Sequence, residues 1–135
     1  MTEPVRVVLV DDHSMFRSGV RAELAADAGV EIVGEAGGVS EAIAVIARTR
    51  PDVVVMDAML PGLDSVEATR RMFAGTGAAV MLLTACEDAD RSFAALRAGA
   101  SGLLLKDTGP AELLRAVEAV ARGEAPLPAR PPLAA

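Results

Sequence analysis

The stretch VRVVLVDD at residues 5–12 places two carboxylates directly after a run of mainly β-branched residues. Such a run is about the length of a strand, and its lack of alternation favours a strand that is buried on both faces. The pattern recurs at residues 53–56, where Asp57 follows VVVM. It also recurs at residues 79–84, AVMLLT, and at residues 102–105, where Lys106 follows GLLL. These repeats predict buried strands with polar side chains at their ends.

Helical patterns separate these strands from one another and from a further predicted strand at residues 30–35. Helices are predicted at residues 14–28, 40–48, 64–73, 88–98 and 110–122. Ser40 is the expected N-cap of the second helix, before the apolar residues Ala42, Ile43 and Ile46. On the first helix, Phe16, Val20 and Leu24 form one apolar stripe. The alternation predicts an α/β fold with a doubly wound five-stranded parallel sheet of order 2-1-3-4-5, the flavodoxin-like arrangement. Half of an α/β barrel shows the same pattern, but a barrel needs about twice this length.

The 135 residues suit one domain, which is predicted at residues 4–123. Residues 124–135 hold four of the eight prolines, which favours a linker or tail. No apolar run approaches the roughly 18 residues of a membrane span, and the first residues do not read as a secretory signal. Cys86 is the single cysteine, so an internal disulfide is excluded and a reducing cytoplasm is favoured.

The charge balance disfavours direct binding to nucleic acid. Nineteen acidic and 13 basic residues give a net charge of −6, and there is no Trp or Tyr to stack on bases. Lys106 is the single lysine among the 13 basic residues. The chain therefore uses an ammonium instead of a guanidinium in one place only.

Five polar side chains follow or end predicted strands, and the carboxyl ends of parallel strands lie at one edge of the sheet. Ligands of such folds bind at this edge, so the five side chains are expected to meet there. They are Asp11, Asp12, Asp57, Thr84 and Lys106. Each alone has an ordinary explanation, such as a turn or cap for aspartate or a solvated charge for lysine. Together, close carboxylates repel each other by roughly 4 kcal/mol per pair at an effective dielectric near 20, and a bound cation relieves that repulsion. Oxygen ligands favour Mg²⁺ over Zn²⁺.

A carboxylate-bound Mg²⁺ beside a hydroxyl and an ammonium suits a phosphoryl group. Asp57 ends the central strand and is the expected nucleophile, forming an aspartyl phosphate. His13 is not expected to bind metal, because it lies at a helix start without a second histidine. Cys86 is expected to be a packing residue.

Four stretches carry a more specific pattern: VVLVDDHSMFRSGVRAEL from residue 7, PDVVVMDAMLPGLDSVEATR from residue 51, VMLLTA from residue 80 and RAGASGLLLKD from residue 97. Over about residues 4–123 the chain resembles the receiver domain of two-component response regulators, most closely the NarL/FixJ (LuxR-type) group. The resemblance implies a phosphoacceptor rather than an enzyme, with a sensor histidine kinase as its partner. Phosphorylation would shift its conformation to control output. Members of the group continue into a helix-turn-helix DNA-binding domain, which has no counterpart in these residues.

The resemblance also implies a role for each site residue. Asp12, Asp57 and the backbone carbonyl of Met59 would ligate Mg²⁺, with Asp11 acting largely through water. The phosphoryl oxygens would be contacted by Thr84 and Lys106 and by the backbone N–H groups of Ala58 and Ala85. A homodimer on phosphorylation is a further outcome that the resemblance allows.

Leu103 departs from the family, which usually has Tyr or Phe at this position, so the switch could be weaker or use other contacts. A docking module that works without phosphorylation and a stand-alone regulator therefore stay open as alternatives. Leu103, Leu113 and Val117 could form a dimer face or belong to the core. A phosphatase would want an acid where Met59 stands, and a flavin-binding loop would want Ser, Thr or Gly after the first strand, so both are disfavoured.

Overall fold

The computed structural model describes residues 3–58, 60, 77–84 and 99–124. Within these residues five parallel strands form one sheet of order β2-β1-β3-β4-β5, which confirms the predicted topology. The strands are β1 Val5–Val10, β2 Val30–Ala36, β3 Val53–Asp57, β4 Ala79–Thr84 and β5 Gly102–Leu105.

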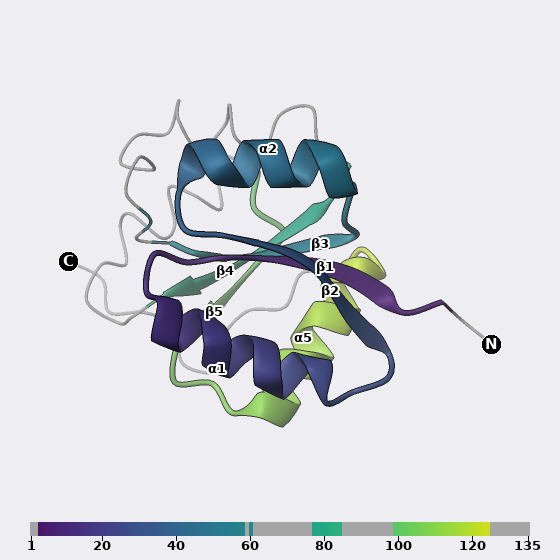
Figure 1. Ribbon diagram of the computed structural model, residues 1–135. Helices are drawn as coiled ribbons and strands as arrows, with labels where there is room; N and C mark the ends of the chain where they lie inside the picture. Colours follow the sequence, from purple (N-terminus) through teal and green to yellow (C-terminus); the bar gives the residue numbers. More distant parts are fainter. Residues whose placement is uncertain (1–2, 59, 61–76, 85–98, 125–135) are drawn as a thin grey trace.

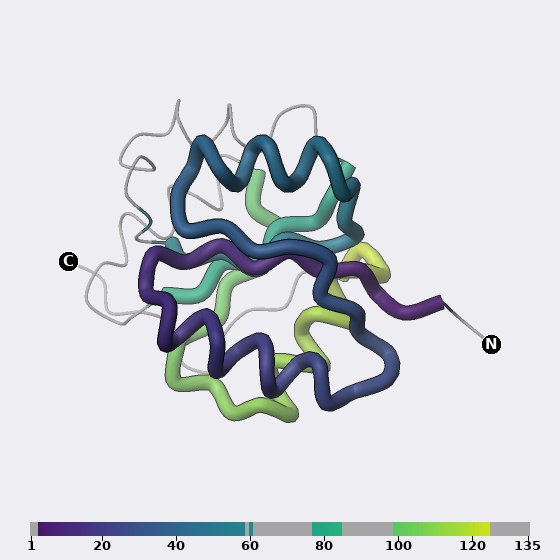
Figure 2. The backbone as a smooth tube through the Cα atoms, viewed as in Figure 1, coloured from purple at the N-terminus to yellow at the C-terminus, as the bar shows by residue number. Residues whose placement is uncertain are grey.

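Helices cover both faces of this sheet (Figure 1). The helix α2, Val39–Thr49, lies on one face, and α1, Ser14–Ala25, and α5, Pro110–Ala121, lie on the other, as the tube view also shows (Figure 2). The predicted helices at 64–73 and 88–98, Cys86 and most of the predicted tail lie outside the described residues. No helix in the described ranges is both long enough and apolar enough to span a membrane.

The two faces of the sheet build two separate apolar cores. Successive residues of a strand point to opposite faces, so Val8 of β1 packs on the α2 side and Val7 packs on the side of α1 and α5. The central strand β3 is buried along its whole length. Burying one large apolar side chain stabilises a fold by about 1.5–3 kcal/mol, so strands apolar on both faces hold this sheet between its helices.

The N-cap predicted for the second helix was wrong. The helix α2 begins at Val39 with Gly38 as its N-cap, so Ser40 is not the cap. Glu41 accepts the Gly37 N–H at 2.7 Å, which places a carboxylate at this helix start. Ile43 is 49% exposed, because the buried residues of α2 follow the spacing Ala42, Val45 and Ile46.

The first helix is shorter than predicted. It ends at Ala25 and not at residue 28, because Asp27 forms a turn in which its Oδ1 accepts the Gly29 N–H at 2.7 Å. Such aspartate turns compete with helical hydrogen bonds. The N–H of Val30 then donates to the Asp27 carbonyl at 3.2 Å and starts β2.

Leu103, Leu113 and Val117 belong to the core. Leu103 and Val117 have no exposed surface and Leu113 has 3%. The core alternative is therefore confirmed for these three residues.

Candidate functional site

The carboxyl ends of four strands converge at one edge of the sheet. Asp57 is the last residue of β3 and Thr84 is the last residue of β4, while Asp11 and Lys106 directly follow β1 and β5. The register places Thr84 opposite Leu105, so Lys106 lies one residue beyond Thr84. The Lys106 N–H donates to the Thr84 carbonyl at 2.8 Å, which fixes the turn that leaves β5.

Lys106 joins two of the carboxylates. Its Nζ lies 3.1 Å from Oδ2 of Asp57 and 3.3 Å from Oδ2 of Asp11. Asp57 is 2% exposed, Asp11 is 4% exposed and Thr84 is fully buried. Two buried carboxylates therefore share one ammonium, at the sheet edge where the sequence predicted that these residues meet.

The pKa of Lys106 lies above its ordinary value of 10.5. Burial by itself would lower this pKa, because a charged group loses hydration, but the hydrogen bond to Asp57 and the charges of Asp57 and Asp11 outweigh it. Lys106 is consequently a full positive charge at neutral pH.

The carboxylates form a cluster in which a cation fits. One oxygen from each of Asp11, Asp12 and Asp57 and one nitrogen of His13 all lie within 4.8 Å of one another. Oδ1 of Asp11 accepts the His13 N–H at 2.8 Å, but its buried Oδ2 accepts no hydrogen bond from the described residues and has only the ion pair with Lys106. Buried oxygens normally have such donors, so a hard divalent cation suits this donor set.

His13 lies closer to this cluster than the sequence indicated. Its Nδ1 is 3.3 Å from Oδ1 of Asp11 and 3.3 Å from Oδ1 of Asp12, while the imidazole is 70% exposed. The sequence set His13 aside because it has no second histidine. The structure brings it to the rim of the cluster.

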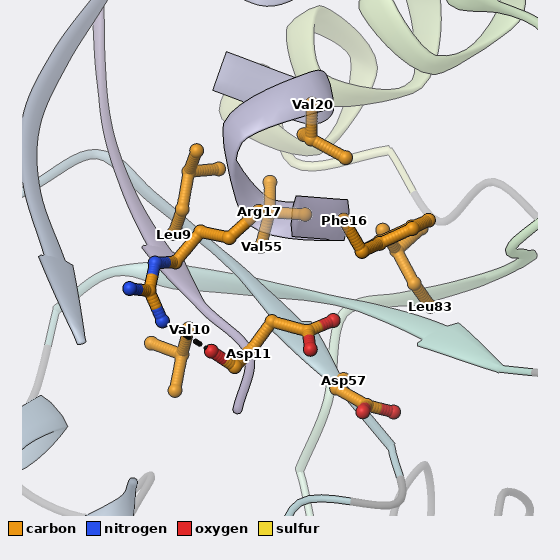
Figure 3. A pocket seen from close by; sticks show the side chains of 9 residues that line it. All are labelled: Leu9, Val10, Asp11, Phe16, Arg17, Val20, Val55, Asp57 and Leu83. Atoms are coloured by element: carbon orange, nitrogen blue, oxygen red, sulfur yellow. Dashed lines mark hydrogen bonds between the residues drawn. The ribbon is translucent and has the colours of Figure 1, made fainter. Parts of the chain in front are cut away.

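Arg17 supports the turn that carries Asp11 and was not recognised from the sequence. Its Nη1 donates to the carbonyl oxygen of Asp11 (Figure 3) and to that of Ala36. Its Nε donates to Oε1 of Glu35 at 3.1 Å. These bonds tie the end of β1 to the end of β2. A single arginine in a helix carries no pattern that distinguishes this role, because the carbonyls become neighbours only when β1 and β2 pair.

Phe16 was expected only as a core residue, but its ring also faces the site. The Lys106 Nζ lies over this ring, 4.6 Å from its centroid. In Figure 3, Phe16 and Leu83 lie together on one side of a pocket that Asp11 and Asp57 also line. The helix stripe gave no signal of this contact, because it depends on how α1 packs against the end of β5.

The backbone groups expected at the site are only partly described. The N–H of Ala58 donates to the Leu83 carbonyl at 2.8 Å, so in this conformation the sheet uses it. Met59 and Ala85 lie outside the described residues. The predicted role of Ala58 would require that N–H to leave or share its bond to Leu83.

Residues 7–118 match the family model described as the response regulator receiver domain. The chain is 42% identical over 123 residues to the nitrate/nitrite response regulator protein NarP of Escherichia coli, covering 89% of this chain and 56% of NarP. It is 40% identical over 120 residues to the DNA-binding transcriptional activator DevR/DosR of Mycobacterium tuberculosis, covering 88% of this chain and 55% of that protein. The chain therefore spans little more than half the length of these relatives.

Solved structures of response regulators share this fold. The signal receiver domain of NarL from Mycobacterium tuberculosis superposes with a TM-score of 0.83 at 35% identity, covering 91% of this chain and all of that one. A LuxR-family response regulator from Aurantimonas sp. superposes with a TM-score of 0.80 at 38% identity, covering 92% of this chain and 90% of that one. The chain belongs to the response regulator receiver domain family, among two-component regulators of the NarL and LuxR type.

Proposed function

We propose that Asp57 of this receiver domain accepts a phosphoryl group from a sensor histidine kinase in a Mg²⁺-dependent reaction. The observation that carries this proposal is the buried Asp57 carboxylate at the end of the central strand, 3.1 Å from the ammonium of the single lysine, Lys106. A buried carboxylate held by a fixed cation is positioned without a search through rotamers. In phosphoryl transfer, the protein contributes mainly by positioning the reacting groups and stabilising charge.

The cation would be held by Asp12, Asp57 and the backbone carbonyl of Met59, with Asp11 acting through water. The Oδ2 of Asp11, which accepts no hydrogen bond from the described residues, and the cluster within 4.8 Å support a hard divalent ion at this place. When bound, Mg²⁺ supplies positive charge for the phosphoryl oxygens and offsets the repulsion among the carboxylates.

In the proposed transfer, a carboxylate oxygen of Asp57 forms a bond to the phosphorus of a phosphohistidine. The bond from phosphorus to the histidine nitrogen breaks, and that nitrogen keeps the electron pair and takes a proton. Lys106 would turn its ammonium from the Asp57 carboxylate towards the transferred phosphoryl oxygens. Thr84, fully buried at the neighbouring strand end, would donate its hydroxyl to one of them.

The proposed backbone donors to the phosphoryl group are the N–H groups of Ala58 and Ala85. Because the Ala58 N–H is bonded to Leu83, phosphorylation would have to exchange this bond. That exchange would couple chemistry at Asp57 to the pairing of β3 with β4. It offers one route by which the proposed switch could begin.

The proposed output is control of transcription in the cytoplasm, through a C-terminal DNA-binding domain, and a homodimer that forms on phosphorylation is part of this proposal. Three relatives named as transcriptional regulators or activators support this proposal, and the chain covers 55–57% of their length. The domain proper is proposed to span residues 4–123, with a linker from residue 124.

A phosphorylation-independent docking module is the second candidate. Leu103 favours it, because this position holds a fully buried aliphatic side chain and no ring that could move on phosphorylation. This candidate predicts that partner affinity does not change with a phosphoryl analogue.

The test is the intact mass of the protein after incubation with acetyl phosphate, with and without Mg²⁺. Wild type and the control Asp52→Ala, which removes an exposed carboxylate beside Arg6, are expected to gain one phosphoryl group with Mg²⁺. Asp57→Ala is expected to gain none. No gain in wild type would refute the phosphoacceptor proposal and favour the docking module.

A further inference from the structure

We propose that Phe16 is a positioning residue for Lys106, and that its ring holds the ammonium against the carboxylates of Asp57 and Asp11. The inference rests on the proposed roles of Asp57 and Lys106 and adds a residue from a different element of the fold. Its basis is the position of Nζ, 4.6 Å from the ring centroid and 3.1 and 3.3 Å from the two carboxylate oxygens.

Three elements converge on this ammonium. Asp11 follows β1 and Asp57 ends β3, and the ring of Phe16 comes from the first turn of α1. Lys106 reaches them from the end of β5 through a flexible four-carbon chain. An ammonium on such a chain samples many rotamers unless its surroundings select one, and each contact that selects it reduces the entropy lost when a phosphoryl group is bound.

An aromatic ring suits this task better than a further polar group. The ring face attracts a cation through its quadrupole, but it does not replace the carboxylate and phosphoryl oxygens as hydrogen-bond acceptors for the ammonium. A third carboxylate at this place would also hold Lys106, yet it would repel an incoming phosphoryl group. Phe16 therefore fixes the ammonium while leaving its N–H groups for oxygens.

Core packing alone does not account for the position of this ring. Val20 and Leu24, on the same stripe of α1, are 7% and 0% exposed, whereas Phe16 is only half-buried. Phe16 and Lys106 both line a groove of about 280 Å³ that also includes Leu113 of α5. The ring thus borders open space on one side and the ammonium on another.

The direct test uses the fact that Lys106 is the single lysine of the chain. Labelling with ¹³C-lysine gives one side-chain spin system, so the ε-methylene signal needs no assignment. A ring below the ammonium shields nearby nuclei, and we expect this signal upfield of its free-lysine position in wild type. Phe16→Leu should lose the upfield shift, and Phe16→Tyr, which keeps a ring, should retain it.

The functional readout is the rate of phosphoryl uptake from acetyl phosphate at saturating Mg²⁺, followed by intact mass. Phe16→Leu is expected to lower this rate about fivefold, the size of a partly desolvated cation–π contact expressed as a rate ratio. Phe16→Tyr should restore the rate to within twofold of wild type by the same measure. Affinity for Mg²⁺, measured by calorimetry, should not fall in Phe16→Leu, because the ring is proposed to hold Lys106 and not the carboxylates that bind the cation.

A matched control separates positioning from packing. Val20→Ala removes buried apolar volume one turn further along α1, where the side chain lies in the core. It should lower the stability to urea more than Phe16→Leu does, yet leave the ε-methylene shift and the uptake rate as in wild type. A structural role for Phe16 would instead make rate follow stability across all three variants.

Two outcomes would overturn the inference. One is a lysine signal that does not differ between wild type and Phe16→Leu, and the other is an unchanged uptake rate in Phe16→Leu. If wild type itself takes up no phosphoryl group, the proposed function fails, while the lysine signal still decides whether the ring holds the ammonium.

Discussion

Replacing Lys106 by Met removes the cation between two buried carboxylates and shortens the side chain by one atom. At an effective dielectric near 20, the ion pairs at 3.1 and 3.3 Å each correspond to about 5 kcal/mol of attraction. The carboxylate oxygens, within 4.8 Å of one another, repel by at least about 3.5 kcal/mol per pair. The variant retains this repulsion and loses the attraction.

The net effect is smaller, because burying the ammonium also costs hydration. Breaking a buried pair by removing one partner typically costs about 3–5 kcal/mol. The Lys106 side chain is 23% exposed, so solvent already weakens its pairs. We therefore expect Lys106→Met to lower the free energy of unfolding by about 2–3 kcal/mol in the absence of divalent cations.

Mg²⁺ should narrow this difference. The proposed cation binds the same carboxylates as the ammonium, so its affinity should rise when the ammonium is gone. A tenfold tighter site would recover about 1.4 kcal/mol at saturation, because ligand binding stabilises the folded state by RT ln(1 + [Mg²⁺]/Kd), which grows by RT ln 10 when Kd falls tenfold. In MgCl₂ the difference in free energy of unfolding between wild type and Lys106→Met should therefore shrink by RT times the logarithm of the ratio of their Mg²⁺ dissociation constants.

The assay is urea unfolding followed by far-UV circular dichroism, since the chain has no Trp or Tyr for fluorescence. Each variant is unfolded in EDTA and in MgCl₂, and calorimetry gives the dissociation constants. Arg122→Met, which removes an exposed cation paired with Glu124, should behave as wild type. Equal stability of wild type and Lys106→Met in EDTA, or a gap that Mg²⁺ does not change, would refute this reasoning.

Three further predictions concern the surroundings of the site. Gly34→Ala should lower the free energy of unfolding by about 1–3 kcal/mol, because the added Cβ would meet the Val45 side chain at 2.6 Å. Gly19→Ala should raise the free energy of unfolding by about 0.5–1 kcal/mol, because nothing lies within 4 Å of its added Cβ. A Gly19→Ala variant that is less stable than wild type in urea unfolding would contradict this. Because the pKa of Lys106 is raised, its contribution to stability is fully present below pH 10.5 and is lost as pH rises through the higher folded-state pKa. The stability gap to Lys106→Met in EDTA should therefore stay level from neutral pH to about pH 10 and narrow above 10.5, and a gap that narrows earlier would contradict the assignment. Arg17→Met should weaken Mg²⁺ binding in calorimetry about tenfold by loosening the Asp11 turn, and equal affinity in the variant and wild type would show that the turn needs no such support.

The topology and the convergence of Asp11, Asp57 and Lys106 at one sheet edge could be predicted from the sequence. Each of these residues follows or ends a short apolar run, and in a parallel sheet all carboxyl ends lie at the same edge. Local pattern is sufficient here, because strand direction alone brings the side chains together. The resemblance to receiver domains rests on the same stretches, and the match of residues 7–118 to the receiver family model confirms it.

Tertiary structure alone decided the contacts made across elements. Phe16 reaches Lys106 only because α1 packs beside the end of β5, and Arg17 reaches the Asp11 and Ala36 carbonyls only because β1 pairs with β2. Likewise, the Ala58 N–H donates to the Leu83 carbonyl only because β3 and β4 pair in this register. Such contacts depend on packing distances between distant segments, and no spacing within one segment encodes them.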